Sequence, residues 1–274
     1  MSSNWALRAV RRRLGAGLAL CAALLVGHAS ANDAAARRII GFSPDGRYFA
    51  FEQYGTQEWS DNNSGYSEIA VIDTNDDSFV GGKPIKIVDE RENSGLTLED
   101  ARRRAAAQAA PLLAKYAIAV RGTRVAFDKL TFPDEMLGRD YIARVEDASL
   151  KQLSPETDDA TRLSWIVLEN VLADSAADCS GVSVEGQPAI PAGKARGFRL
   201  SFDRMDDGGK TTKVLHEDKA VPASRDCPTS YSLSEAYVFE PKSGPPVIAV
   251  LVQRFGQGWE GRDRRFIAVT GKVR

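Results

Sequence analysis

Residues 39–52 read IIGFSPDGRYFAFE, which places two apolar segments on either side of a Ser-Pro-Asp-Gly turn. Pro44 presets φ for that turn, and Gly46 supplies a position that tolerates unusual backbone angles. Isoleucine, phenylalanine and tyrosine in the flanking segments favour extended backbone. The stretch therefore predicts a β-hairpin at the start of a β-rich fold.

Two more strand-like segments, residues 66–73 and 83–89, follow this hairpin. With them, residues 32–95 resemble a single blade of a WD-repeat-like propeller, in which Phe-Ser-Pro-Asp-Gly commonly lies between strands. A propeller needs several blades of roughly 40–45 residues each, and this chain contains Phe-Ser-Pro-Asp-Gly once. We expect one blade-like sheet and not a complete propeller.

Residues 96–117 carry a helical pattern. Thr97 and Asp100 approximate a capping box at its start. Apolar side chains then recur every three or four residues, at Leu98, Ala101, Ala105, Ala109, Leu112 and Tyr116. Because alanine allows close approach, we expect this helix to lie flat on a sheet. Pro111 is expected to kink the helix or to split it near Ala110.

Residues 118–274 are predicted to be mainly β-structure. Strand-like segments lie at 124–129, 163–173, 196–203, 211–216, 245–255 and 265–273. Residues 247–252, VIAVLV, are apolar on both faces, which is typical of a central strand. The predicted fold class is α+β, with mainly antiparallel sheets and one Ala-rich helix packed on them, and residues 32–274 form a single exported domain.

Residues 1–31 have the pattern of a signal peptide. Four arginines and no acidic residue precede an apolar run of about 13 residues, and Ala29-Ser30-Ala31 follows as a cleavage site. The apolar run is shorter than the roughly 20 residues that span a bilayer. A twin-arginine signal at Arg11-Arg12 and lipidation at Cys21 are weaker alternatives. We therefore predict a periplasmic or secreted protein, cleaved after Ala31.

Removal of this segment changes the charge balance. The whole chain has 36 basic and 37 acidic residues, and the removed segment holds four of the basic ones. The remaining 243 residues therefore carry a net charge of about −5, which disfavours a nucleic-acid partner. The basic run at residues 102–104 is explained as a solvated helix face. Since no later segment is long and apolar enough to span a bilayer, we expect no stable membrane insertion after signal removal.

Two cysteines, Cys179 and Cys227, remain after cleavage. An even pair in an exported chain predicts a disulfide, which would close a loop of about 48 residues and contribute up to roughly 4 kcal/mol. Two free thiols or a redox pair are the alternatives. They are less well supported because the chain has no Cys-x-x-Cys motif.

His216 is the only histidine left after cleavage, which excludes a His-rich zinc site. A Ser-His-Asp arrangement remains possible by count, but no G-x-S-x-G motif accompanies it. Its charged surroundings favour a surface residue at a strand end. The glycine motifs of phosphate and dinucleotide sites are also absent, so we expect no cofactor and assign no catalytic or metal-binding residue.

Acidic clusters supply the remaining candidates for a site. Residues 73–78 resemble the start of a calcium loop, but serine and proline stand where the loop needs glycine and glutamate, so a turn explains them better. The second cluster, Trp259-Glu260-Gly261-Arg262-Asp263, supplies four ligand-site candidates: Trp259, Glu260, Arg262 and Asp263. A charged hairpin tip over Glu260 to Arg265 explains this stretch better than a ligand site does.

Four segments together resemble one protein family. They are FSPDGRY at 42–48, LTLEDAR at 96–102, PASRDCP at 222–228 followed by Tyr231, and WEGRDRRFIAV at 259–269. The chain is similar through them to the bacterial predicted secreted proteins grouped as domain of unknown function 2259. The resemblance implies export and a shared fold, and it implies no activity. This chain differs from the family pattern at Trp259, where phenylalanine is more usual.

The sequence thus favours a non-enzymatic protein of the cell envelope that binds an envelope protein or a small ligand. The alternative is a periplasmic hydrolase that uses acidic or Ser residues. A purely structural envelope component is a third possibility.

Overall fold

The structure is a computed structural model of residues 1–274. It describes residues 33–57, 63–89, 91, 95–127, 141–144, 163–183, 187–206, 209–258 and 262–273. Residues 1–31, with the predicted signal peptide and its cleavage site, lie outside the described residues.

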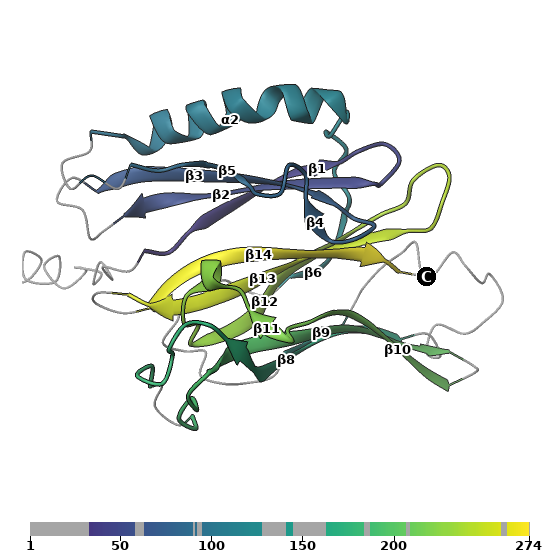
Figure 1. The fold of residues 1–274 in the computed structure, drawn as a ribbon. Helices are drawn as coiled ribbons and strands as arrows, with labels where there is room; N and C mark the ends of the chain where they lie inside the picture. Colours follow the sequence, from purple (N-terminus) through teal and green to yellow (C-terminus); the bar gives the residue numbers. More distant parts are fainter. Residues whose placement is uncertain are drawn as a thin grey trace, which may run out of the picture. The chain divides into compact units, whose positions relative to one another are not determined.

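The predicted hairpin opens the first of three sheets (Figure 1). The strands of this first sheet are β1 (Ala36–Phe42), β2 (Tyr48–Gln57), β3 (Ser64–Asp73), β4 (Ser78–Phe79) and β5 (Ile85–Ile87). They are antiparallel, in the order β1-β2-β3, with β4 and β5 both pairing with β3. The Ser-Pro-Asp-Gly turn lies between β1 and β2, where Gly46 has a φ of 73° and the Ser43 hydroxyl donates to Asp45.

Helix α2 (Leu98–Lys115) covers one face of the first sheet (Figure 1). Thr97 caps it, because its hydroxyl accepts the backbone N–H of Asp100 at 3.1 Å. The alanine stripe is buried as predicted and packs against Ala50, Ile69 and Val71 of β2 and β3. The approach is so close that a Cβ on Gly65 would lie 2.3 Å from the Leu98 Cα, which explains a glycine in β3.

Two expectations for the helix can be compared with the structure, the kink or split at Pro111 and the solvated basic face. The helix continues through Pro111 and is not split, because Pro111 lies on the exposed face, where water can satisfy the carbonyl that loses its N–H partner. Arg102 does not belong to a solvated face. Its guanidinium donates to the buried carboxylate of Glu52 and lies 3.7 Å from the centre of the Tyr54 ring. The Arg102 side chain is therefore held against the sheet beneath the helix.

The middle sheet has the order β14-β13-β12-β6 and is antiparallel throughout. Its strands are β6 (Thr123–Phe127), β12 (Ser230–Phe239), β13 (Val247–Gln257) and β14 (Arg262–Lys272). Alternate residues of β13 pack toward the first sheet, at Val247, Ala249 and Leu251, and toward the third sheet, at Ile248, Val250 and Val252. This burial on both faces confirms the predicted central strand.

The third sheet has the order β10-β9-β8-β11, with β7 also pairing with β8. Its strands are β7 (Tyr141–Arg144), β8 (Leu163–Ser175), β9 (Lys194–Asp206), β10 (Gly209–Glu217) and β11 (Ala220–Val221), and the short helix η2 (Ala223–Arg225) follows. Helix, first sheet, middle sheet and third sheet thus form successive layers (Figure 1). The fold is α+β and β-rich, and the described residues form no propeller, as predicted.

Strand β12 was not predicted, although it pairs with neighbours on both sides. Ser230, Ser232 and Ser234 are buried in it, at positions where strand prediction looks for large apolar side chains. The hydroxyl of Ser232 accepts a hydrogen bond from the Gln253 side chain on β13. The hydroxyls of Ser230 and Ser234 have no hydrogen-bond partner among the described residues, and Tyr231 and Leu233, which alternate with the serines, are buried in the core between the middle and third sheets.

Candidate functional site

The sequence candidates lie around the turn between β13 and β14. Trp259 and Glu260 fall outside the described residues, and Arg262 is described by its backbone only. Asp263 is described, and it pairs with Gly256 within the β13–β14 ladder. Residues 263–265 are therefore part of strand β14, directly after the turn that joins it to β13.

The N-terminal segment Asp33–Ala35 covers the edge of β14 at this point. Ala34 forms a parallel bridge with Arg264. The Arg264 N–H donates to the Asp33 carbonyl, and the Ala35 N–H donates to the Arg264 carbonyl, both at 3.1 Å. Asp33 is 7% exposed and Ala35 is 0% exposed. The first described residues of the chain are thus buried against one of its last strands.

Arg265 holds this segment in place. Its Nη2 lies 2.5 Å from Asp33 Oδ2, and its Nη1 donates to the Asp33 carbonyl at 2.9 Å. The guanidinium also lies 4.6 Å from the centre of the Tyr66 ring on β3. Burial raises the pKa of Tyr66 well above its usual range, so the ring stays neutral beside the cation.

Asp263 lies next to this pair. Burial raises the pKa of its carboxyl, and the nearby Asp33 carboxylate raises it further, against the opposing charge of Arg265. The backbone N–H of Asp33 acts in the opposite direction and lowers this pKa. In the described part of the chain, Asp263 forms no ion pair with a lysine or arginine.

Arg254 occupies the neighbouring position on β13, directly opposite Arg265 on β14 and Tyr231 on β12. Burial lowers its pKa, and the charge of Arg265 lowers it further. Like charges on directly opposite residues of adjacent strands destabilise a sheet. Nη1 of Arg254 donates to the backbone carbonyl of Arg225, and among the described residues no carboxylate forms an ion pair with it.

Arg225 belongs to a second group of charges, centred on Asp218. The Asp218 carboxylate accepts hydrogen bonds from Arg225 Nη1 at 2.8 and 3.0 Å and from the Phe198 N–H at 2.9 Å. Burial by itself would raise the pKa of Asp218, but the bond to His216, the charge of Arg225 and the Phe198 N–H outweigh it, and the pKa is lowered. Asp218 thereby joins β9, the end of β10 and η2.

His216 is not the surface residue that the sequence suggested. Its side chain is 24% exposed, its Nε2 lies 2.9 Å from Asp218 Oδ1, and its ring stacks on Phe198 at 4.6 Å between centres. The charged residues around it in sequence pointed to solvent, whereas β10 places the ring against the buried Phe198. His216 belongs to the Asp218 group, and no described interaction joins it to Asp263.

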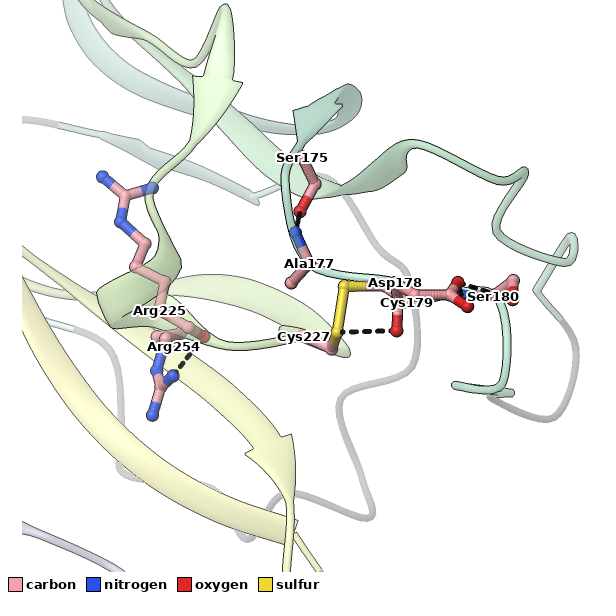
Figure 2. Close-up of a disulfide and its surroundings, with 8 residues drawn as sticks. All are labelled: Ser175, Ala177, Asp178, Cys179, Ser180, Arg225, Cys227 and Arg254. Carbon is pink, nitrogen blue, oxygen red and sulfur yellow. Dashed lines mark hydrogen bonds between the residues drawn. A yellow bond between two sulfur atoms is a disulfide. The ribbon is translucent and has the colours of Figure 1, made fainter.

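The disulfide lies beside this group (Figure 2). Cys179 and Cys227 are bonded, as predicted, with their Cα atoms 5.3 Å apart, within the usual range. Cys179 is buried in a small apolar cluster with Ala173, Ile190, Ala195 and Val221. Figure 2 shows Arg225 two residues before Cys227, with the Arg225 carbonyl bonded to Arg254. The disulfide therefore anchors the segment that carries Arg225.

The described residues contain no group of three or more His, Cys, Asp or Glu side chains placed to hold a metal ion. Within the same residues, no helix has the length and apolarity needed to cross a membrane.

Four residues of the site were missed by sequence reasoning: Asp33, Asp218, Arg225 and Arg254. Arg254 carried a usable signal, since it is a charged residue within strand β13, two positions after the apolar run of residues 247–252. Of the other three, Asp33 precedes β1, Asp218 follows β10 and Arg225 lies in η2, and their contacts depend on the stacking of the sheets.

In the described part of the chain, the fold and the site define a class: a disulfide-bonded protein of three stacked β-sheets covered by one α-helix, with a cluster of charged residues at the end of its middle sheet. Within that class, the chain belongs to the family described as predicted secreted protein (DUF2259), whose model matches residues 50–272. This confirms the resemblance seen in the sequence. Comparisons with curated proteins and with solved structures found no match.

Proposed function

We propose that residues 1–31 are a signal peptide cleaved after Ala31, and that the remaining chain is a non-enzymatic protein that binds a partner or ligand in the periplasm or outside the cell. The predicted secretion of its family and the disulfide support this location, because disulfides persist in oxidising compartments.

Arg254 is the observation that carries the binding proposal. Two neighbouring arginines have carboxylate partners, Asp218 for Arg225 and Asp33 for Arg265, whereas the described bond of Arg254 goes to a backbone carbonyl. A guanidinium presents a planar fork of donors that matches a carboxylate or phosphate. The bound group is therefore acidic, and it approaches the end of the middle sheet at the β13–β14 turn.

Trp259, Glu260 and Arg262 lie on or beside this turn in sequence. An aromatic side chain next to an arginine is the usual composition of a binding hot spot. We therefore keep these residues, with Asp263, as the ligand-site candidates.

Site-specific photo-cross-linking in the producing cells tests this proposal. A photoreactive residue replaces Gln257, which is exposed at the end of β13, and in a matched control it replaces Gln108, which is exposed on α2. We expect a discrete adduct from position 257 and none from position 108. The adduct should weaken in Arg254→Gln and in Arg254→Lys, which keeps the charge and lacks the fork. The same adducts from both positions, or none from 257, would count against the proposal.

The hydrolase alternative depends on Asp263, whose raised pKa near a second carboxylate is a property of general acids. A panel of ester, peptide and glycoside substrates tests it. Activity that survives alanine at His216, Glu260 and Asp263 would exclude this site as its source.

A further inference from the structure

Arg196, on β9, is a buried arginine whose hydrogen bonds are incomplete. It is 9% exposed, its Nη2 donates to the Pro188 carbonyl at 2.8 Å, and its Nε has no hydrogen-bond partner among the described residues. No carboxylate in the described part of the chain forms an ion pair with it. Arginine is almost never fully buried without a partner, because removing its charge from water is costly. The guanidinium of Arg196 therefore lacks an anionic partner.

Other arginines of the fold show what is missing here. Arg199, three residues further along β9, donates to the Glu169 carboxylate at 2.6 Å. The pKa of Arg102 is raised, because its hydrogen bond to Glu52 outweighs the effect of burial. Burial lowers the pKa of Arg196, and no carboxylate opposes that shift. The charge of Arg196 is thus uncompensated within the described chain.

Gln187 supplies a second incomplete group beside this arginine. Both polar atoms of its side-chain amide, Oε1 and Nε2, are buried without a hydrogen-bond partner among the described residues. Gln187 directly precedes Pro188, whose carbonyl is bonded to Arg196. Three buried polar atoms that need partners therefore belong to two residues joined through one hydrogen bond.

Leu172 shows that solvent reaches this part of the third sheet. It lies opposite Arg196 in the β8–β9 ladder, and residues directly opposite each other place their side chains on one face of a sheet. Leu172 is 46% exposed, which is unusual for leucine in this fold. An apolar side chain open to solvent therefore lies next to the uncompensated guanidinium.

We propose that Arg196 and Gln187 bind a small organic carboxylate that also carries a hydrogen-bond donor, such as a hydroxy acid. The N–H groups of a guanidinium and of an amide match the oxygens of a carboxylate. Oε1 of Gln187 can only accept a hydrogen bond, so the ligand has to supply a donor. Leu172 offers a contact for its carbon chain. This site lies on the third sheet and does not depend on the binding proposed at Arg254.

NMR of the exported protein with isotope-labelled arginine tests the site in the native chain. The Nε–H signal of Arg196 is assigned by its absence in Arg196→Lys. Lactate is the hydroxy acid, acetate is a carboxylate without a donor, inorganic phosphate is the other anion, and sodium chloride controls for ionic strength. We expect lactate to shift this signal saturably, with a Kd about fivefold lower than that of acetate, because acetate leaves Oε1 of Gln187 unpaired.

Calorimetric titration of variants with lactate separates the site from other arginines. Arg196→Lys should abolish binding, and Gln187→Leu, which leaves the charge of Arg196 in place, should raise the Kd about tenfold. The matched control is Arg199→Lys on the same strand, which should leave the Kd unchanged because Arg199 already pairs with Glu169. Arg254→Lys should also leave it unchanged, so that failure of this site and failure of the proposed function give different results.

Glu185→Gln tests whether the chain itself supplies the partner. Glu185 is the carboxylate nearest to Gln187 in sequence, and it lies outside the described residues. We expect the lactate Kd to stay unchanged in this variant. A Kd lowered about tenfold would show that Glu185 competes for Arg196 and would overturn the proposal.

Three other results would overturn it. An Nε–H signal of Arg196 that does not shift, or that shifts equally with sodium chloride, would show that water completes these hydrogen bonds. Tighter binding of phosphate than of lactate would exclude a carboxylate as the class of ligand. Binding that is lost in Arg254→Lys and kept in Arg196→Lys would place the ligand at the β13–β14 turn.

Discussion

Asp77 Oδ1 accepts two hydrogen bonds from Thr270, one from the backbone N–H at 2.7 Å and one from the hydroxyl at 2.8 Å. Asp77 lies in the turn between β3 and β4 with a φ of 54°, and Thr270 lies on β14. These bonds join the first sheet to the middle sheet. Burial raises the pKa of Asp77 to about 6, although both bonds from Thr270 oppose the shift.

Asp77 should make stability depend on pH in the direction opposite to that of most carboxylates. Its folded pKa of about 6 is above the ordinary value of 3.8, so the folded state binds the proton more tightly than the unfolded state does. The folded protein therefore gains stability from this group as pH falls from about 7 to 4. Asp77→Asn should remove a gain of up to roughly 3 kcal/mol, at about 1.4 kcal/mol per pKa unit.

Urea unfolding of both proteins at pH 4, 5, 6 and 7 measures this difference. His216, whose charge lowers the pKa of Asp77, is present in both proteins. A difference between the two proteins that stays constant over this range would contradict the assignment.

Arg102 and Arg103, adjacent on α2, should differ sharply on substitution. Glu52 is 1% exposed and accepts from Arg38, Arg102 and Ser67, whereas Arg103 pairs with Asp100 on the helix surface. Arg102→Ala removes one of two cations from a buried carboxylate and should cost about 2–4 kcal/mol. Arg103→Ala should cost less than about 0.5 kcal/mol. Equal losses in the free energy of unfolding would show that Glu52 does not depend on Arg102.

The disulfide should contribute strongly to stability. Replacing both Cys179 and Cys227 with alanine opens a loop with a sequence separation of 48 and should lower the free energy of unfolding by up to about 4 kcal/mol. Reduction of the native protein by dithiothreitol should have a similar effect and should leave the alanine variant unchanged. A native protein whose unfolding is insensitive to the reductant would show that the bond is not formed.

Asp218 should be the most sensitive charged residue of the third sheet. Its pKa is lowered in the folded state, so its contribution is present above the ordinary pKa of 3.8 and is lost as pH falls through the lower folded pKa. Asp218→Asn should cost about 2–4 kcal/mol at pH 7, because Arg225 loses its partner. His216→Phe keeps the stacking on Phe198 and should cost less than about 1.5 kcal/mol. Thermal unfolding at pH 7 measures the stability of both variants. A larger loss of stability in His216→Phe than in Asp218→Asn would contradict the central role of Asp218 in this group.

Local chemistry accounts for the elements that could be predicted. The Ser-Pro-Asp-Gly turn, the Thr97 cap and the VIAVLV segment each act through neighbours in sequence, and the structure places a hairpin, a helix start and a central strand at these points. Strand β12 was not predicted, because buried serines alternate in it with Tyr231 and Leu233, and only the packing of the sheets shows that both of its faces are buried. Arg102 was misplaced because its partner, Glu52, lies 50 residues away.

The charged site was likewise predicted only where local sequence carries the information. The sequence indicated the stretch from Trp259 to Asp263 and the pairing of the two cysteines, since both depend on residue type and count. It could not indicate that Asp33 meets Arg265, 232 residues further along the chain.

The sequence by itself determined the first hairpin, the helix, the central strand β13 and the disulfide pair, because turn chemistry, hydrophobic pattern and residue counts are local or compositional. Only the tertiary structure decided that Asp33, Arg254, Asp263 and Arg265 share one end of the middle sheet. Strand register and the stacking of sheets set such distances, and both arise from burial over the whole chain.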